Sequence, residues 1–208
     1  MRHLMFDIDG TLVESIKFDA QCFLDSVFEV LNQYPSDDWA SYIDVTDSGI
    51  LKQMFKMLDI KGNQEQYALE IKQKFIEKIK KHIQNNPVKP ISGAVEFIQK
   101  LKKENNVKVS FATGGWRETA ILKLKSAGFN VDDIVLFSSD DHYQRVQIMK
   151  LAQGDSLNEQ VVYFGDGIWD QVACAELDYE FIAVGESLID CATIPDFLNY
   201  KHRFELVS

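Results

Sequence analysis

Residues 4–12 read Leu-Met-Phe-Asp-Ile-Asp-Gly-Thr-Leu, an apolar run that ends in two closely spaced carboxylates. The apolar residues predict a short buried strand, and Gly10 allows the backbone to turn directly after it. Ligands of open parallel sheets bind beyond the carboxyl ends of the strands, which is where Asp7 and Asp9 would project. Two neighbouring carboxylates repel each other, so keeping both ionised requires a cation or hydrogen bonds. Taken alone, the stretch is equally well explained as an Asp turn that caps the next helix.

Further apolar runs of strand length lie in the second half of the chain, each closed by turn or polar residues. They cover residues 107–113, 134–138, 161–165 and 181–185. Segments with helical spacing lie between them, at residues 119–127, 146–152 and 171–177. Alternating strands and helices predict an α/β fold with a doubly wound parallel sheet.

A long helical segment interrupts this alternation after the first strand. Apolar residues recur at helical spacing over residues 15–32 and 64–84, which predicts a small all-α bundle. We therefore expect an α/β core domain formed by residues 1–14 and 89–208 and an inserted helical domain formed by residues 15–88. Aromatic residues of the insertion are expected to pack in its core rather than to line a pocket. They are Phe18, Trp39, Tyr42 and Phe55.

A second acidic turn follows a later strand. Residues 161–170 read Val-Val-Tyr-Phe-Gly-Asp-Gly-Ile-Trp-Asp, which places Asp166 and Asp170 four residues apart at the start of a helix. Helix capping explains either residue singly. Together with Asp7 and Asp9 at an equivalent strand end, they favour a site for a hard cation such as Mg²⁺, which prefers carboxylate oxygens and shares its other positions with water and phosphate.

The strand end near residue 113 offers groups that could hold an anion. Thr113 is followed by Gly114 and Gly115 at the start of a helix, where a hydroxyl and unobstructed backbone N–H groups can bind phosphate. A Thr-Gly-Gly turn is weak evidence by itself. Arg145, at the start of a later helix, could supply a fixed cation beside the phosphate.

These motifs, in this order, resemble those of the haloacid dehalogenase-like hydrolase superfamily, in particular its Mg²⁺-dependent phosphatases with an α-helical cap inserted after the first motif. The resemblance spans nearly the whole chain. It implies that Asp7 attacks phosphorus and forms an aspartyl-phosphate, while Asp9 serves as general acid and then general base.

The resemblance also implies a ligand set for each ion. Mg²⁺ would be held by the carboxylates of Asp7 and Asp166 and by the backbone carbonyl of Asp9, with Asp170 supporting the metal site. The phosphate would be bound by Thr113, Gly114 and Arg145. Arg145 stands where the family has a lysine, and a planar guanidinium is not equivalent to a compact ammonium. This departure leaves a weak or altered activity open.

Other functions remain alternatives. A phosphomutase shares the two-aspartate chemistry, and a dehalogenase of the same superfamily shares the nucleophile but lacks the second acid, which this chain has as Asp9. A receiver-like module also forms an aspartyl-phosphate, but its acceptor follows a later strand. A non-catalytic phosphoryl-binding protein is a further alternative.

Charge and cysteine content limit the classes of partner and the cellular compartment that we expect. Acidic residues outnumber Lys and Arg by 32 to 22, giving a net charge of -10, which disfavours nucleic acid and anionic membranes. The expected partner is a small phosphorylated metabolite, bound by a monomer or homodimer. Three widely spaced cysteines, an odd number, indicate free thiols in a reducing compartment, and we expect a cytoplasmic protein.

Overall fold

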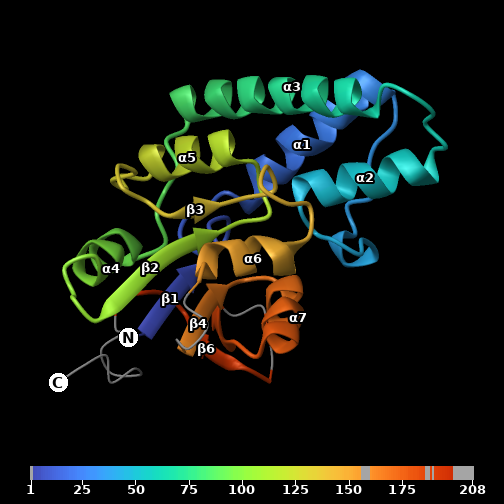
Figure 1. Ribbon diagram of the computed structural model, residues 1–208. Coiled ribbons are helices and arrows are strands. Elements are labelled where there is room, and N and C mark those ends of the chain that lie inside the picture. The colour runs from blue at the N-terminus through green and yellow to red at the C-terminus, as the bar shows by residue number, and fades with distance from the viewer. Residues whose placement is uncertain (1, 156–159, 186–187, 189, 199–208) are drawn as a thin grey trace.

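The computed structural model describes residues 2–155, 160–185, 188 and 190–198. Its centre is a six-stranded parallel sheet with the strand order β3-β2-β1-β4-β5-β6 (Figure 1). The strands are β1 (Arg2–Phe6), β2 (Val107–Ala112), β3 (Leu136–Phe137), β4 (Gln160–Gly165), β5 (Glu180–Val184) and β6 (Ala192–Ile194). The predicted α/β fold with a doubly wound parallel sheet is confirmed. The short strand β6 was not predicted. Residues 1, 156–159, 186–187, 189 and 199–208 belong to the predicted core ranges 1–14 and 89–208 but lie outside the described residues.

Helices cover both faces of the sheet, because successive strand residues point to opposite sides. These helices are α4 (Ala94–Leu101), α5 (Arg117–Ser126), α6 (Arg145–Gln153) and α7 (Ile168–Leu177). Leu4 and Phe6 pack with residues of α4 and α5, whereas Met5 packs with residues of α6 and α7. The two resulting apolar clusters hold the sheet rigidly between helices, so the strand ends form a fixed platform.

The segment between β1 and α4 is helical, as expected. It contains α1 (Ile16–Leu31), the short 3₁₀ helix η1 (Trp39–Ser41), α2 (Asp47–Met57) and α3 (Gln64–Asn85), which lie together above the carboxyl ends of the strands in Figure 1. Phe23 of α1, Phe55 of α2 and Phe75 of α3 share one buried cluster. Trp116, from the loop after β2, is part of the same cluster, with its ring 5.6 Å from that of Phe75. The inserted helices are therefore packed against the sheet platform through this loop.

The thiols of Cys22, Cys174 and Cys191 are all free. Among the described residues, no helix combines the length and the apolar character needed to cross a lipid bilayer.

A buried histidine in β1 makes the stability of the fold depend on pH. The His3 side chain is fully buried, and its Nε2 lies 2.7 Å from Oγ of Ser110 on the neighbouring strand β2. Burial, followed by the positive charge of Lys108, lowers the pKa of His3 to about 4. An unfolded histidine binds a proton near pH 6.5, so between these two values the unfolded state holds more protons and stability falls as pH falls.

Replacing His3 with glutamine is expected to weaken this pH dependence. Between about pH 7 and pH 4.5, the free energy of unfolding of the wild type should fall by on the order of 1 to 3 kcal/mol more than that of His3→Gln. Urea unfolding at both pH values measures the difference. An equal change in the free energy of unfolding between the two pH values for both proteins would show that His3 does not cause the pH dependence.

Candidate active site

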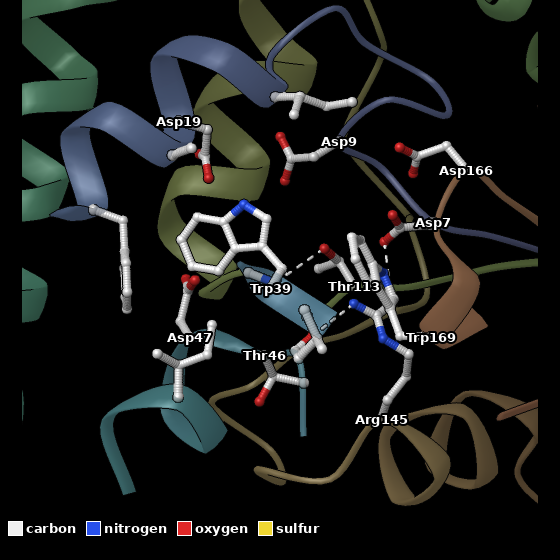
Figure 2. Close-up of a pocket in the computed structure, with 17 residues that line it drawn as sticks. Asp7, Asp9, Asp19, Trp39, Thr46, Asp47, Thr113, Arg145, Asp166 and Trp169 are labelled. Atoms are coloured by element: carbon white, nitrogen blue, oxygen red, sulfur yellow. Dashed lines mark hydrogen bonds and ion pairs between the residues drawn. The ribbon is translucent and has the colours of Figure 1, made fainter. Parts of the chain in front are cut away.

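Three neighbouring strands end beside one cavity. Phe6 of β1 pairs in register with Phe111 of β2 and Phe164 of β4, so the residues that follow these strands meet at one edge. The cavity at this edge has a volume of about 350 Å³, which is the size of a site for a small molecule. Six of the predicted site residues line it (Figure 2): Asp7, Asp9, Thr113, Gly114, Arg145 and Asp166.

The carboxylates of Asp7, Asp166 and Asp170, here called the acidic cluster, converge beside this cavity. One oxygen from each lies within 4.8 Å of the other two. Burial, then the negative charge of Asp170, raises the pKa of Asp7 well above its usual range. The same two causes raise the pKa of Asp166 to about 7. Such a cluster is costly when ionised, so its geometry favours a bound cation.

Gly10 allows the first acidic turn to approach the second. Its φ is 78°, a left-handed conformation that favours glycine, and a Cβ at this position would overlap the carboxylate of Asp166. The glycine of the first motif is therefore needed for both the turn and the close approach of Asp166.

Arg145 lies between the acidic cluster and the inserted segment. Its Nη1 donates to Oδ1 of Asp170 at 2.7 Å and lies 3.7 Å from Oδ1 of Asp7, while its Nη2 donates to the carbonyl of Val45 at 3.0 Å. Burial opposes the charge, but Asp170 and other neighbours raise the pKa of Arg145 above its usual range, so it remains a cation. A Cβ on Gly114 would overlap this guanidinium. The structure thus places the Arg145 guanidinium at the wall of the cavity, beside Asp7.

The Asp170 carboxylate makes hydrogen bonds to other groups of the protein. Its Oδ1 accepts from Arg145, and its Oδ2 accepts from the backbone N–H of Gly167 at 3.2 Å. The hydroxyl of Tyr163 also lies 3.3 Å from Oδ1. These contacts orient Arg145 and the turn that carries Asp166.

Thr113, Asp9 and Asp47 surround one small space at Gly115. A methyl group built on Gly115 would lie 3.6 Å from Oδ2 of Asp9, 3.7 Å from Oγ1 of Thr113 and 3.8 Å from Oδ2 of Asp47. Oγ1 of Thr113 accepts from the N–H of Gly115 at 3.2 Å, which leaves the hydroxyl proton available to a ligand. Absence of a side chain at Gly115 keeps this part of the cavity open.

Lys123 is a residue at the site that our sequence analysis did not identify. It is fully buried in α5, and its Nζ lies 2.6 Å from Oδ1 of Asp9 and 2.5 Å from Oδ1 of Asp19. Burial opposes the charge, but Asp19 and Asp9 raise the pKa of Lys123 above its usual range. The sequence did contain a signal: Lys123 lies four residues after Thr119 and four before Ala127, on the buried face of the helix. A lysine on a buried face indicates an ion pair.

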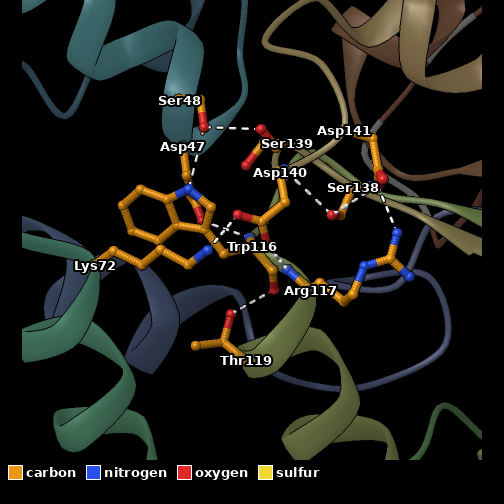
Figure 3. A network of polar contacts seen from close by, with 10 residues as sticks. All are labelled: Asp47, Ser48, Lys72, Trp116, Arg117, Thr119, Ser138, Ser139, Asp140 and Asp141. Carbon is orange, nitrogen blue, oxygen red and sulfur yellow. Dashed lines mark hydrogen bonds and ion pairs between the residues drawn. The ribbon is translucent and has the colours of Figure 1, made fainter. Parts of the chain in front are cut away.

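Polar contacts join the insertion to the loops at the carboxyl ends of the strands (Figure 3). The N–H of Trp116 donates to Oδ2 of Asp47 at 2.9 Å, and its indole Nε1 donates to Oγ of Ser48 at 3.1 Å. Ser48 donates to the carbonyl of Ser139 at 2.9 Å, and Lys72 of α3 pairs with Asp140. The start of α2 is therefore held over the loops that follow β2 and β3.

The insertion forms one wall of the cavity, here called the far wall. Its lining residues include the carboxylates of Asp19 and Asp47 and the aromatic rings of Phe23 and Trp39, and the others are Ile16, Ala20, Val45, Thr46 and Ile50. Trp39 was expected to pack rather than to line a pocket, and it does both, because it also packs against the apolar cluster of the insertion. Burial, then the charge of Asp19, raises the pKa of Asp47 well above its usual range. Burial also raises the pKa of Asp19, to about 6, despite the opposing charge of Lys123. Within the described lining of the cavity, Arg145 is the only cationic residue.

Comparisons with known proteins agree with this architecture. A search of curated proteins by sequence gave no match. Among solved structures, the chain is similar to a hydrolase from Pseudomonas syringae, with a TM-score of 0.76 and 21% identity over 100% of each chain. It is also similar to CbbY from Rhodobacter sphaeroides in complex with phosphate, with a TM-score of 0.72 and 14% identity over 96% of each chain. A third similar structure is beta-phosphoglucomutase from Clostridium difficile, with a TM-score of 0.71 and 12% identity over 98% of this chain and 95% of that one.

At these identities the solved structures show a shared fold. The family is shown by sequence, because the model described as haloacid dehalogenase-like hydrolase matches residues 4–184. The chain, whose first acidic turn, second acidic turn and inserted helices meet at one cavity, therefore belongs to the haloacid dehalogenase-like hydrolase family.

Proposed function

We propose that this protein is a Mg²⁺-dependent phosphatase that hydrolyses a small phosphomonoester through an aspartyl-phosphate on Asp7. The observation that carries the proposal is the acidic cluster, of which Asp7 and Asp166 line the same cavity as Asp9, Thr113 and Arg145. Oδ1 of Asp7 is buried and has no hydrogen-bond partner among the described residues, so a ligand is needed to satisfy it.

The donor set fits magnesium. Asp7 and Asp166 offer hard carboxylate oxygens, and the backbone carbonyl of Asp9 is a further oxygen ligand. Asp170, already bonded to Arg145 and Gly167, would support the site by orienting its neighbours. When bound, Mg²⁺ would neutralise negative charge on the transferring phosphoryl oxygens.

The side chains divide the reaction into two balanced steps. In the first, an oxygen of Asp7 forms a bond to phosphorus while the ester P–O bond breaks, and Asp9 gives its proton to the departing alkoxide. In the second, Asp9 takes a proton from water as the water oxygen bonds to phosphorus, and the bond to Asp7 breaks. Thr113, the N–H of Gly114 and Arg145 bind the phosphoryl oxygens through both steps.

We further propose that residues 15–88 form a cap domain over a core formed by residues 1–14 and 89–208. The cap supplies the far wall and excludes bulk water from the cavity, which strengthens electrostatic interactions inside it. A cavity of about 350 Å³ under such a cap suits a small metabolite.

The far wall indicates which leaving groups fit. It combines aromatic rings with two carboxylates, and Arg145, the only cationic residue in the part of the lining that the structure describes, lies near Asp7, where the phosphate would bind. A second anionic group on the substrate would therefore face Asp19 and Asp47. We infer a leaving group that is neutral or cationic, such as an alcohol or amino alcohol. A phosphomutase that turns over a bisphosphate is disfavoured for the same reason, and Asp9 argues against a dehalogenase.

A panel of phosphate esters with added Mg²⁺ tests this proposal. We expect phosphate release from propyl and 2-aminoethyl phosphate with kcat/KM at least about tenfold higher than from phosphoglycolate or a sugar bisphosphate, since a second anionic group beside these carboxylates, with no cation of the far wall to pair with it, should cost more than about 1.4 kcal/mol. Malachite green detection of phosphate measures each rate. A preference for the doubly anionic esters would contradict the leaving-group assignment, and no release from any ester would contradict the function.

A further inference from the structure

Lys123 joins two carboxylates that come from distant parts of the chain. Its Nζ lies 2.7 Å from Oδ2 and 2.6 Å from Oδ1 of Asp9, and 2.5 Å from Oδ1 of Asp19. The lysine side chain has no exposed surface, whereas Asp9 and Asp19 are 19% and 18% exposed toward the cavity. The ammonium is therefore inside the protein, and the two carboxylates that it holds face the substrate space.

The Asp9 carboxylate is fixed in a definite direction by these contacts. Besides Lys123, the hydroxyl of Ser15, just before α1, donates to Oδ1 of Asp9. The Asp9 side chain is not part of the acidic cluster, although Asp7 is only two residues earlier. Asp9 thus points toward α5 and the far wall, where the leaving group of a substrate bound at Asp7 would lie.

We propose that Lys123 is a positioning residue that holds the Asp9 carboxylate on the leaving-group side of the cavity, with Asp19 completing its pairing. This inference rests on the proposed function, because it assigns Asp9 its place as proton donor. Without Lys123, the Asp9 carboxylate would be drawn toward the nearest remaining cations, which are Arg145 and an ion at the acidic cluster. From there it could not protonate the leaving oxygen. Lys123 itself keeps its three protons throughout.

Asp19 connects this arrangement to the insertion. It lies in the first turn of α1, and α1 is part of the helical bundle that lines the cavity. The ammonium is therefore fully paired only when Asp19 faces α5. This arrangement couples the position of the proton donor to the docking of the cap helices.

The dependence of kcat/KM on the leaving group distinguishes a role of Lys123 in positioning the general acid from a merely structural role. A para-nitrophenolate departs without a proton, whereas an alkoxide needs one, so loss of the general acid slows only the alkyl ester in the first chemical step. The ratio of kcat/KM for propyl phosphate to kcat/KM for para-nitrophenyl phosphate reports this step. In Lys123→Met we expect kcat/KM for propyl phosphate to fall about 100-fold and that for para-nitrophenyl phosphate to fall less than about fivefold.

Two more variants complete the experiment. Lys123→Gln retains a hydrogen-bond donor for Asp9 and should show the same selectivity with a smaller loss, and it decides the question if Lys123→Met does not fold. Lys125→Met, on the exposed side of the same helix, should leave both esters unchanged. A folded Lys123 variant in which both esters fall equally, or neither falls, would overturn the inference. Failure of the proposed function would be seen separately, as retained turnover of either ester by Asp7→Asn.

Discussion

Replacing Asp7 with asparagine is expected to lower phosphate release from para-nitrophenyl phosphate by at least about 1,000-fold, because an amide oxygen does not form a stable bond to phosphorus in place of a carboxylate. The fold should survive. Burial and the neighbouring carboxylates raise the pKa of Asp7, so a neutral amide of the same size removes repulsion within the acidic cluster. In the metal-free protein the Tm of Asp7→Asn should therefore equal or exceed that of the wild type. Phosphate release and thermal unfolding followed by circular dichroism measure the two effects.

Asp132→Asn is a matched control, because this aspartate is exposed and lies in the turn after α5, outside the cavity lining. It should change neither activity nor Tm measurably. Turnover by Asp7→Asn within about tenfold of the wild type would mean that another group is the nucleophile.

Removal of divalent cations is expected to have the second largest effect. Dialysis against EDTA should lower turnover at least about 100-fold, and added Mg²⁺ should restore it, since the charge of the transferring phosphoryl group would otherwise face the acidic cluster unscreened. Mg²⁺ should also stabilise the fold. At about 100 times its Kd, the gain of about 2.7 kcal/mol corresponds to a rise in Tm of roughly 5 to 10 °C. Activity assays and thermal unfolding with and without Mg²⁺ measure both.

The pH dependence of this stabilisation has a definite sign. Burial and Asp170 raise the pKa of Asp166 to about 7 in the metal-free protein, so protons compete with the cation below that value. The rise in Tm caused by Mg²⁺ should therefore be largest above about pH 7 and shrink as the pH falls. In Asp166→Asn it should be largely lost, while in Asp132→Asn it should persist. An EDTA-treated wild type that remains fully active would contradict the metal assignment.

Much of the fold could be predicted because its signals are local. The strands β1, β2, β4 and β5 are five or six residues long and rich in apolar residues, so their composition is enough to recognise them. Strand β6 has only three residues, and its identity depends on pairing with β5, which no local pattern reveals. Two amphipathic helices, α2 and α4, were not singled out either.

The site residues that lie close together in the sequence could be predicted from their motifs. Those that come together only in the folded structure, from distant parts of the sequence, could not. Asp7 and Asp9 lie in one turn, and Asp166 and Asp170 in another, so spacing alone brings each pair to notice. Lys123 lies 114 residues from Asp9 and 104 from Asp19. Its position on a buried helix face indicates an ion pair but not the partners.

The amino-acid sequence by itself determined the alternation of strands and helices, the helical insertion and the acidic turns, because hydrophobic periodicity and turn residues act over a few positions. Only the tertiary structure decided that Asp9 pairs with Lys123, that Arg145 reaches both Asp170 and Val45, and that carboxylates line the far wall. These contacts join elements whose relative positions depend on packing of the whole core. Coulombic interactions and burial act through space rather than along the chain, so the electrostatics of the cavity exist only once the chain has folded.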